Sequence, residues 1–548
     1  MTLSICCAQR NFVVGDLSGN VQKIIDAAAQ AHAQGARLLL TPELALCGYA
    51  AEDLYLRPAF IAACQEAMEQ LKAASTRWPG LALLIGHPRQ DAAGAPLFNA
   101  ASVLRDGQLV ASYAKQLLPN FGVFDEQRYF AAGDQPCVVD IDGVNIGLLI
   151  CEDAWHSGPA KAAVDAGAQL LAVINASPFH AGKQAERETV LAQRATETGV
   201  PLVYAHLVGG QDEVVFDGGS FAVQADGQIA ARAAAFGEDL LLVKAQPTGG
   251  RLALAGEIQP APAHHEALWS ALVLSVRDYV GKNRFPGAII GLSGGMDSAL
   301  VLSIAVDALG ADKVRTVMMP SPYTADISWL DAREMAERVG VQHEEINIAP
   351  QFEAFKAALA PAFAGRAEDT TEENLQARIR GTLLMGMSNK FGSIVLTTGN
   401  KSEMSTGYCT LYGDMAGGFA VIKDVLKTEV FALARWRNAN DPFGTGLDPI
   451  PDRIITRPPS AELRPDQKDQ DSLPAYEVLD AIVRRYMENN ESIASIVADG
   501  YASADVERVT RLIQINEYKR RQAPVGPRLT RRSFGKDWRY PITNRFRA

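Results

Sequence analysis

"AIIGLSGGMDSALVLSIAVDALG" (Ala288–Gly310) is the stretch that decides the fold of the second half of the chain. A short apolar run, a turn with two adjacent glycines and a long apolar run predict a strand, a tight turn and a helix. Because glycine has no side chain, the N–H groups of the turn can surround an anion, and the start of the helix adds its positive end. The turn has neither G-x-G-x-x-G nor the Lys-Ser/Thr pair of a Walker A loop. We therefore expect the turn to hold a pyrophosphate that is the leaving group of the reaction.

The segments on either side of this turn have different patterns. Downstream, the strand-like runs VRTVMMP, HEEINI and SIVLTTG are separated by helical runs, which predicts a doubly wound parallel sheet. Upstream, strand-like runs such as LSICCAQ and QLLAVINAS end at polar residues, and the pairs Asp106-Gly107 and Asp142-Gly143 predict hairpin turns. Mixed strand pairing with a few long helices indicates an α/β sandwich.

A Gly- and Pro-rich segment, Ala245–Leu268, separates the two patterns. A chain of 548 residues is also too long for a single hydrophobic core. We therefore predict an α/β protein of two domains. The N-terminal sandwich would occupy residues 1–257, and a doubly wound nucleotide-binding domain would occupy residues 258–548.

Composition limits the class of protein. The net charge of −11 argues against affinity for nucleic acid, which needs a basic face. No apolar run approaches the roughly 20 residues of a membrane helix, and the N-terminal residues lack the pattern of a signal peptide. Seven cysteines without C-x-x-C spacing fit neither a disulfide framework nor a zinc site. We expect a cytoplasmic protein that acts on small molecules, without nucleic-acid or membrane partners.

Asp297 is the first charged residue of the helix that follows the glycine turn. A carboxylate in a first helical turn is favourable by itself, and a glycine turn without a ligand is the simplest alternative for the loop. Beside bound phosphates, however, a carboxylate is placed to hold Mg²⁺.

The turn resembles the pyrophosphate motif of the adenine-nucleotide α-hydrolases, which activate a substrate oxygen as an adenylate and release pyrophosphate. From about Ala263 onward the chain is similar to the NAD synthetases in that family. The similar motifs are ENLQARIRG, TTGNKSE, YGDMAGGFAVIKDVLKTEV, PPSAELRPDQKDQDSLP and YKRRQAP. Each lone Lys or Arg in them could be a solvated surface charge, but five motifs in the family's order favour the resemblance.

The resemblance implies a set of ligand-binding residues. Mg²⁺ would be held by Asp297 and Glu403. ATP would bind to Gly291, Leu292, Ser293, Gly294, Gly295, Met296, Asp297, Ser298, Thr398 and Lys468. Deamido-NAD would bind to Asn374, Arg378, Glu403, Asp414, Lys423 and Lys519.

In the first half of the chain, three chemically distinct groups follow three strand-like runs. Glu43 ends RLLLTPE, Lys115 ends QLVASYAK and Cys151 follows IGLLI. Such a set could supply a base, a cation that favours thiolate and oxyanion, and a nucleophile. The alternative is that Glu43 and Lys115 form a surface ion pair and that Cys151, like the other cysteines, is a small buried hydrophobe.

The motifs TPELALCGY, YAKQLLPNFGVFDEQRYF and ICEDAW resemble the nitrilase-like carbon–nitrogen hydrolase family over about Leu3–Ala245. The resemblance implies that Glu43 is the general base, Lys115 stabilises the tetrahedral intermediate and Cys151 attacks an amide. It makes Glu126 a supporting glutamate. A glutamine site would contain Phe121, Ser177 and Lys183. Many relatives have Tyr in place of Phe121, so a contact through that hydroxyl is lost here.

Together the two halves resemble the glutamine-dependent NAD synthetase family. This implies a ligase that amidates deamido-NAD to NAD through an adenylate, with ammonia from glutamine, releasing AMP, pyrophosphate and glutamate. A homo-oligomer is also implied by the nitrilase-like domain. One alternative is another ATP-pyrophosphatase amidotransferase with a different acceptor. A second is a nucleotide-sensing protein with degenerate sites, although Cys151, Lys115, Asp297 and Glu403 are all present.

Overall fold

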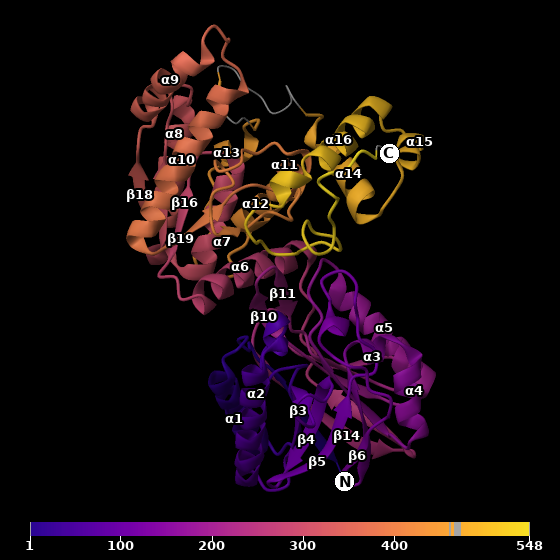
Figure 1. Ribbon diagram of the computed structural model, residues 1–548. Coiled ribbons are helices and arrows are strands. Elements are labelled where there is room, and N and C mark those ends of the chain that lie inside the picture. The colour runs from indigo at the N-terminus through magenta and orange to yellow at the C-terminus, as the bar shows by residue number, and fades with distance from the viewer. Residues whose placement is uncertain (1, 460–461, 465–472, 547–548) are drawn as a thin grey trace. The chain divides into compact units, whose positions relative to one another are not determined.

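The computed structural model of the chain describes residues 2–459, 462–464 and 473–546 (Figure 1). The chain divides into two compact units, Met1–His264 and His265–Ala548. Each unit has its own buried apolar clusters, so each is described by itself.

The first unit is built on two β-sheets. The strands of one sheet are β1 (Leu3–Gln9), β2 (Leu38–Leu40), β3 (Ala82–Gln90), β4 (Leu97–Arg105), β5 (Gln108–Ala114), β14 (Asp239–Thr248) and β15 (Arg251–Gly256). The strands of the other are β6 (Val138–Ile141), β7 (Val144–Ile150), β8 (Leu170–Asn175), β9 (Leu202–His206), β12 (Phe221–Val223) and β13 (Ile229–Arg232). Their orders are β15-β14-β1-β2-β3-β4-β5 and β13-β12-β9-β8-β7-β6, and β10 (Val208–Gln211) pairs with β11 (Val214–Asp217) outside them.

The alternation of side chains along each strand packs the two sheets face to face. Ile5 and Cys7 of β1 point into a cluster shared with Ile146 and Leu148 of β7, whereas Cys6 points to the opposite face. The helices that cover the outer faces are α1 (Leu17–Ala33), α2 (Pro58–Ala74), α3 (Glu152–Trp155), α4 (Ser157–Asp165) and α5 (Lys183–Thr198). Figure 1 shows α1 and α2 on one side of the sheets and α3 to α5 on the other. The predicted α/β sandwich is therefore confirmed.

Both predicted hairpins are present. Asp106-Gly107 joins the antiparallel strands β4 and β5, and Asp142-Gly143 joins β6 and β7. All four turn residues have positive φ, from +49° at Asp106 to +87° at Gly143. This is the backbone of a type I′ turn, which Asp-Gly adopts readily.

The second unit contains one parallel sheet. Its strands are β16 (Ala288–Gly291), β17 (Val314–Met318), β18 (Gln342–Glu345), β19 (Ile394–Thr397) and β20 (Phe419–Ala420). Their order is β18-β17-β16-β19-β20, and every pair is parallel, as the alternation of strands and helices predicts. The chain moves outward from β16 in one direction and returns to β19 on its other side. The carboxyl ends of β16 and β19 therefore flank the topological switch point, where open α/β sheets bind ligands.

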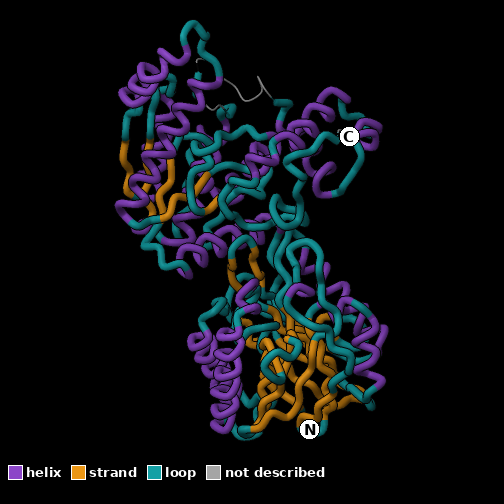
Figure 2. The backbone as a smooth tube through the Cα atoms, in the orientation of Figure 1, coloured by secondary structure: helices purple, strands orange, loops and turns teal. Residues whose placement is uncertain are grey.

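Helices surround this sheet and form an additional helical layer (Figure 2). They are α6 (His264–Lys282), α7 (Met296–Leu309), α8 (Asp326–Val339), α9 (Ala349–Phe363), α10 (Thr370–Phe391), α11 (Lys401–Thr406), α12 (Lys427–Ala439), α13 (Asp452–Thr456), α14 (Tyr476–Val483), α15 (Ile493–Ala498), α16 (Ser503–Ile515) and α17 (Glu517–Arg520). Short helical turns are η1 (Glu52–Leu56), η2 (Ser75–Arg77), η3 (Glu126–Arg128), η4 (Ala311–Lys313) and η6 (Arg484–Glu488).

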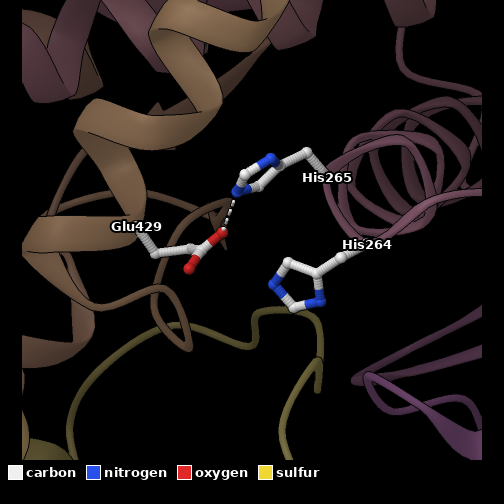
Figure 3. Close-up of side chains that lie close together, drawn as sticks. All are labelled: His264, His265 and Glu429. Atoms are coloured by element: carbon white, nitrogen blue, oxygen red, sulfur yellow. Dashed lines mark ion pairs between the residues drawn. The ribbon is translucent and has the colours of Figure 1, made fainter.

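Buried or half-buried ion pairs connect the helices of the second unit. The Lys401 ammonium lies 2.9 Å from a carboxylate oxygen of Asp424 and 2.7 Å from one of Glu488, and it is fully buried. His265 Nε2 lies 3.1 Å from Glu429 Oε1, which joins the first turns of α6 and α12 (Figure 3). None of the helices within the described residues combines the length and the apolar character that crossing a membrane requires.

Candidate active sites

The charged groups of the first unit meet in its interior. Lys115 follows β5, and its Nζ donates to Glu43 Oε1 at 2.7 Å and to both carboxylate oxygens of Glu126 at 2.9 Å. Glu43 follows β2, and Glu126 begins the short turn η3. Lys115 and Glu43 are completely buried, so the alternative of a surface ion pair is wrong.

Cys151 lies at the end of β7 with φ +47° and ψ −102°, a backbone conformation that non-glycine residues rarely adopt. Its side chain is 1% exposed. Burial raises the pKa of the Cys151 thiol well above its usual range, Glu43 raises it further, and Lys115 opposes both. The expected effect of the cation is present, but burial and the carboxylates outweigh it. The resting group is therefore a neutral thiol that needs a base before it can react.

Glu43 is held from two further directions. Its Oε2 accepts from the backbone N–H of Ala176 at 3.0 Å, directly after β8. Its Oε1 is shared by Lys115 and by the side chain of Asn99 in β4. A carboxylate with fixed orientation beside a thiol can take the thiol proton and return it to a leaving group.

Asp153 is a residue that the sequence analysis missed. Its Oδ1 accepts from the N–H groups of Gln116 and Leu117, at 3.1 and 2.8 Å. Its Oδ2 accepts from the N–H of Ile150 and from the Tyr113 hydroxyl, at 3.2 and 2.8 Å. Burial raises the pKa of Asp153 to about 6. The side chain ties the chain around Cys151 to the chain around Lys115, and the only sequence signal is the second acid after the cysteine.

Two of the expected glutamine-binding residues lie near Cys151. The buried Ser177 hydroxyl accepts from Asn175 Nδ2 and Arg187 Nε, both at 3.0 Å. The Lys183 ammonium lies 3.9 Å from the centre of the Trp155 ring. Burial lowers the pKa of Lys183 and the neighbouring Arg187 lowers it further, while Glu186, 3.1 Å away, opposes both.

Phe121 is placed differently from Ser177 and Lys183. Its ring is 60% exposed and meets Phe124 edge to face at 5.7 Å. It lines a cavity of about 530 Å³ together with Leu118, Gln127 and Glu152. Of these lining residues, Glu152 directly follows Cys151 in the chain.

In the second unit, the glycine turn has the geometry that its sequence predicts. Gly294 has φ +78°, and a Cβ added there would lie 2.3 Å from the carbonyl oxygen of Ser328, so only glycine fits. The hydroxyl of Ser298 accepts from the N–H of Ser293 at 3.2 Å, and helix α7 begins at Met296. Residues 291–298 thus form a closed turn at the carboxyl end of β16.

Asp297 and Glu403 are brought together by a lysine and an amide. Asn400 Nδ2 donates to Asp297 Oδ1 at 2.9 Å, and the Asn400 N–H donates to Glu403 Oε2 at 3.2 Å. Lys427 Nζ pairs with Asp297 Oδ2 and lies 3.9 Å from Glu403 Oε1. Two carboxylates from the first turns of α7 and α11, the helices that follow β16 and β19, therefore face one cation. Oxygen donors of this kind fit Mg²⁺.

Lys427, the first residue of α12, was not predicted as a site residue, whereas Lys423, four residues earlier in the chain, was. The Lys423 ammonium donates to the carbonyl oxygen of Pro524 at 2.9 Å, away from the carboxylates. Thr398 follows β19 and is half-buried, two residues before Asn400. Lys468 lies outside the described residues.

Three of the residues expected to bind a dinucleotide contact one loop, 407–414. Asn374 Oδ1 accepts from the Thr410 hydroxyl at 2.8 Å, and Arg378 Nε donates to the carbonyl oxygen of Leu411 at 3.2 Å. Asp414, the last residue of this loop, accepts from the Thr410 N–H at 2.9 Å. Burial raises the pKa of Asp414 to about 6.

Lys519 contacts the same loop from α17. Its Nζ donates to the carbonyl oxygens of Gly407 and Cys409, both at 2.7 Å. An unexpected contact is made by Arg457, whose guanidinium donates to the carbonyl oxygen of Gly294 at 3.0 Å. The segment after α13 is therefore attached to the glycine turn.

Comparison with known proteins gives matches to both units. The carbon–nitrogen hydrolase family model matches residues 4–252, and the NAD synthase model matches residues 268–523. A glutamine-dependent NAD(+) synthetase of Xanthomonas campestris pv. campestris is 49% identical over 99% of this chain and 98% of its own length. The structure of glutamine-dependent NAD+ synthetase from Acinetobacter baumannii in complex with ADP has a TM-score of 0.79 and 44% identity, covering 99% of both chains. The same fold is found in a synthetase from Cytophaga hutchinsonii, with a TM-score of 0.83 at 23% identity.

The buried network of Lys115, Glu43 and Glu126 leads us to predict an effect on stability. Lys115→Met leaves two buried carboxylates without their cation, which should lower the free energy of unfolding by about 3–5 kcal/mol at neutral pH. Because the carboxylates can then bind a proton, the loss should shrink as the pH falls. Thermal unfolding of the full-length protein across the pH range measures both effects.

The control is the double variant Lys115→Met/Glu126→Gln, which removes the cation and one carboxylate together. It should be more stable than Lys115→Met at neutral pH and less dependent on pH. A loss below about 1 kcal/mol in Lys115→Met at every pH would contradict the network.

Proposed function

The chain belongs to the glutamine-dependent NAD(+) synthetase family, and we propose how its two sets of side chains divide the reaction. Enzymes of this family form a carbon–nitrogen bond with glutamine as the amide donor. In the overall reaction ATP, deamido-NAD, glutamine and water give AMP, pyrophosphate, NAD and glutamate. The single observation that carries the proposal is the buried Lys115 ammonium, which two carboxylates hold in the same interior as Cys151.

Glutamine hydrolysis is assigned to this buried set. Cys151 Sγ attacks the carboxamide carbon while Glu43 accepts the thiol proton, and the Lys115 ammonium stabilises the oxyanion. Glu43 then gives the proton to the departing nitrogen, so ammonia leaves and a thioester remains. Water attacks the thioester with Glu43 again as the base, which releases glutamate and restores the thiol.

Ser177, Lys183 and Phe121 are proposed to bind the glutamine substrate. The Lys183 ammonium lies against the ring of Trp155, four residues after Cys151 in the chain, and could meet an anionic group of the substrate. Phe121 has no hydroxyl, and its exposed ring can contribute only an apolar contact or a backbone group.

The synthetase reaction is assigned to the second unit. A carboxylate is a poor electrophile, so an oxygen of the nicotinate carboxylate first attacks the α-phosphorus of ATP and expels pyrophosphate. The N–H groups of residues 291–298 would hold the departing pyrophosphate. Ammonia then attacks the activated carbonyl carbon, and AMP leaves. The ADP in the Acinetobacter baumannii structure supports an adenine-nucleotide site in this fold.

Asp297 and Glu403 are proposed to hold Mg²⁺, since both present carboxylate oxygens at the switch point. The metal would neutralise charge on the phosphates. Lys427 supplies a further positive charge there. Thr398 and Lys468 are proposed ATP contacts.

The dinucleotide is assigned to residues that share or adjoin the loop 407–414. These are Asn374, Arg378, Asp414 and Lys519, with Glu403 and Lys423 as further proposed contacts. Arg378 and Lys519 bring positive charge to this loop, which suits a substrate that carries phosphates.

The union of both activities in one chain has a chemical reason. Free ammonia is mostly protonated at neutral pH and then has no lone pair for attack, so its release within the same molecule favours the amidation. We assign glutamine hydrolysis to residues 1–257 and amidation to residues 258–548. We further propose a homo-oligomer that works in the cytoplasm, where its seven free cysteines would remain reduced.

Cys151→Ala tests the assignment of the nucleophile. Synthesis of NAD with glutamine should fall by about 10³-fold or more, because no thioester can form. Synthesis with added ammonium salt at alkaline pH should persist, because the second unit is intact. Cys64→Ala, which removes another fully buried thiol, serves as the matched control and should keep both activities. Glutamine hydrolysis at the wild-type rate in Cys151→Ala would refute the assignment.

Asp297→Asn tests the metal and phosphate site. NAD synthesis should fall by about 10²-fold or more with either nitrogen source, because the charge that faces Mg²⁺ is lost, while glutamine hydrolysis remains measurable. Asp326→Asn removes the first-turn carboxylate of α8 and should leave synthesis unchanged. If Asp297→Asn releases pyrophosphate with the wild-type dependence on Mg²⁺, Asp297 is only a favourable charge at a helix start.

A further inference from the structure

Glu43 and Glu126 are joined by a second side chain besides Lys115. Asn99, the third residue of β4, donates from Nδ2 to Glu43 Oε1 at 2.8 Å and to Glu126 Oε2 at 3.4 Å. Because both neighbours are acceptors, the NH₂ end of the amide must face them. The backbone carbonyl oxygen of Asn99 also accepts from the backbone N–H of Lys115 at 2.9 Å. One residue thus contacts all three charged members of the network.

The other end of the Asn99 amide explains why stability alone does not account for this residue. Asn99 is fully buried, and its Oδ1 has no hydrogen-bond partner among the residues that the structure describes. An unpaired buried acceptor is unfavourable, so an apolar side chain of similar size would suit the core of the strand better. What Asn99 adds is its pair of N–H donors, and both face carboxylates of the network.

Asn20 provides the comparison within the same unit. It is equally buried, but its Oδ1 accepts from the N–H of Val13 at 3.0 Å. Its Nδ2 donates to the carbonyl oxygens of Val13 and Leu46, at 2.8 and 3.1 Å. Asn20 therefore satisfies both ends of its amide on the backbone, as a structural residue does.

We propose that Asn99 is a positioning residue for glutamine hydrolysis, which holds the Glu43 and Glu126 carboxylates at a fixed separation by donating a hydrogen bond to each. Glu43 is then able to accept the Cys151 proton. This inference rests on the role proposed above for Glu43. Asn99 acts through the two carboxylates.

The charges around the pair show why a neutral donor matters. Two carboxylates share one ammonium, so the cluster has one negative charge in excess when Cys151 is a thiol. The groups that face it are Lys115, Cys151, the Ala176 N–H and the Tyr49 hydroxyl, which donates to Glu126 Oε1 at 3.0 Å. Burial raises the pKa of Glu126, Lys115 opposes this, and Glu43 adds to it. Loss of the Asn99 donors should favour protonation of the pair further.

The experiment measures kcat/KM for glutamine hydrolysis against pH in the full-length protein. In Asn99→Ala the acid limb, the low-pH side of the curve of kcat/KM against pH, should move upward by about one pH unit. At neutral pH, kcat should fall about tenfold or more, with a smaller change in KM. Asn99→Asp keeps the volume but replaces the donors by a third carboxyl group, so its acid limb should move at least as far. Ammonia-driven NAD synthesis should be unchanged in both variants.

Asn20→Ala is the matched control, and it should lower the Tm without moving the acid limb. A wild-type acid limb in Asn99→Ala, with a loss of kcat no larger than that of Asn20→Ala, would overturn the proposal. If Asn99→Ala fails to fold, the isosteric Asn99→Asp replaces it. An acid limb that moves upward in Asn99→Asp supports the proposal, and a wild-type acid limb overturns it. Absence of glutamine hydrolysis in the wild-type protein would instead refute the function proposed for the unit.

Discussion

The Lys115 ammonium and its two carboxylates are the interaction on which the first unit depends. All three side chains are almost completely buried, and an unpaired charge in such a place is very unfavourable. Their positions therefore have to be fixed together by the ends of β2 and β5 and by the turn η3. The same arrangement sets the chemistry of Cys151. Burial and then the negative charge of Glu43 raise the pKa of the Cys151 thiol well above its usual range, so the thiol remains protonated and the reaction needs Glu43 to remove that proton.

The second unit uses a related arrangement for another purpose. Asp297 and Glu403 are also held by one lysine and one asparagine, Lys427 and Asn400. These carboxylates are partly exposed, with 17% and 19% of their side-chain surface accessible, whereas Glu43 is sealed. A buried carboxylate can exchange a proton directly with a neighbouring thiol, whereas partly exposed carboxylates can receive a metal ion with its phosphates. The difference in exposure thus matches the two reactions proposed.

The sequence predicts those features that depend on neighbouring residues. The Asp-Gly turns, the glycine turn before α7 and the alternation of strands and helices are all local patterns, and the structure contains them. The sequence also indicates Glu43, Lys115 and Cys151 as candidate site residues, because reactive groups at strand ends stand out from the apolar runs before them. Only the structure shows that Glu43 and Lys115 are buried together and do not form an ion pair at the surface.

The missed residues share a physical reason. Asn99 lies inside an apolar strand, and its partners Glu43 and Glu126 are 56 and 27 residues away in the chain. Lys427 and Lys423 are four residues apart in the chain, and only the fold determines which of them faces Asp297. Tertiary contacts of this kind leave no periodic signal in a single sequence.

The most direct test of the account is the protonation state of Cys151. The rate of its alkylation by iodoacetamide can be followed from about pH 6 to about pH 10 by mass spectrometry of the peptide that contains it. The Cys151→Ala variant accounts for the other thiols. We predict slow alkylation at neutral pH and a rate that is still rising at about pH 9, because burial and the carboxylates keep the thiol protonated. A rate that reaches its plateau below about pH 7 would mean a preformed thiolate and would contradict the account.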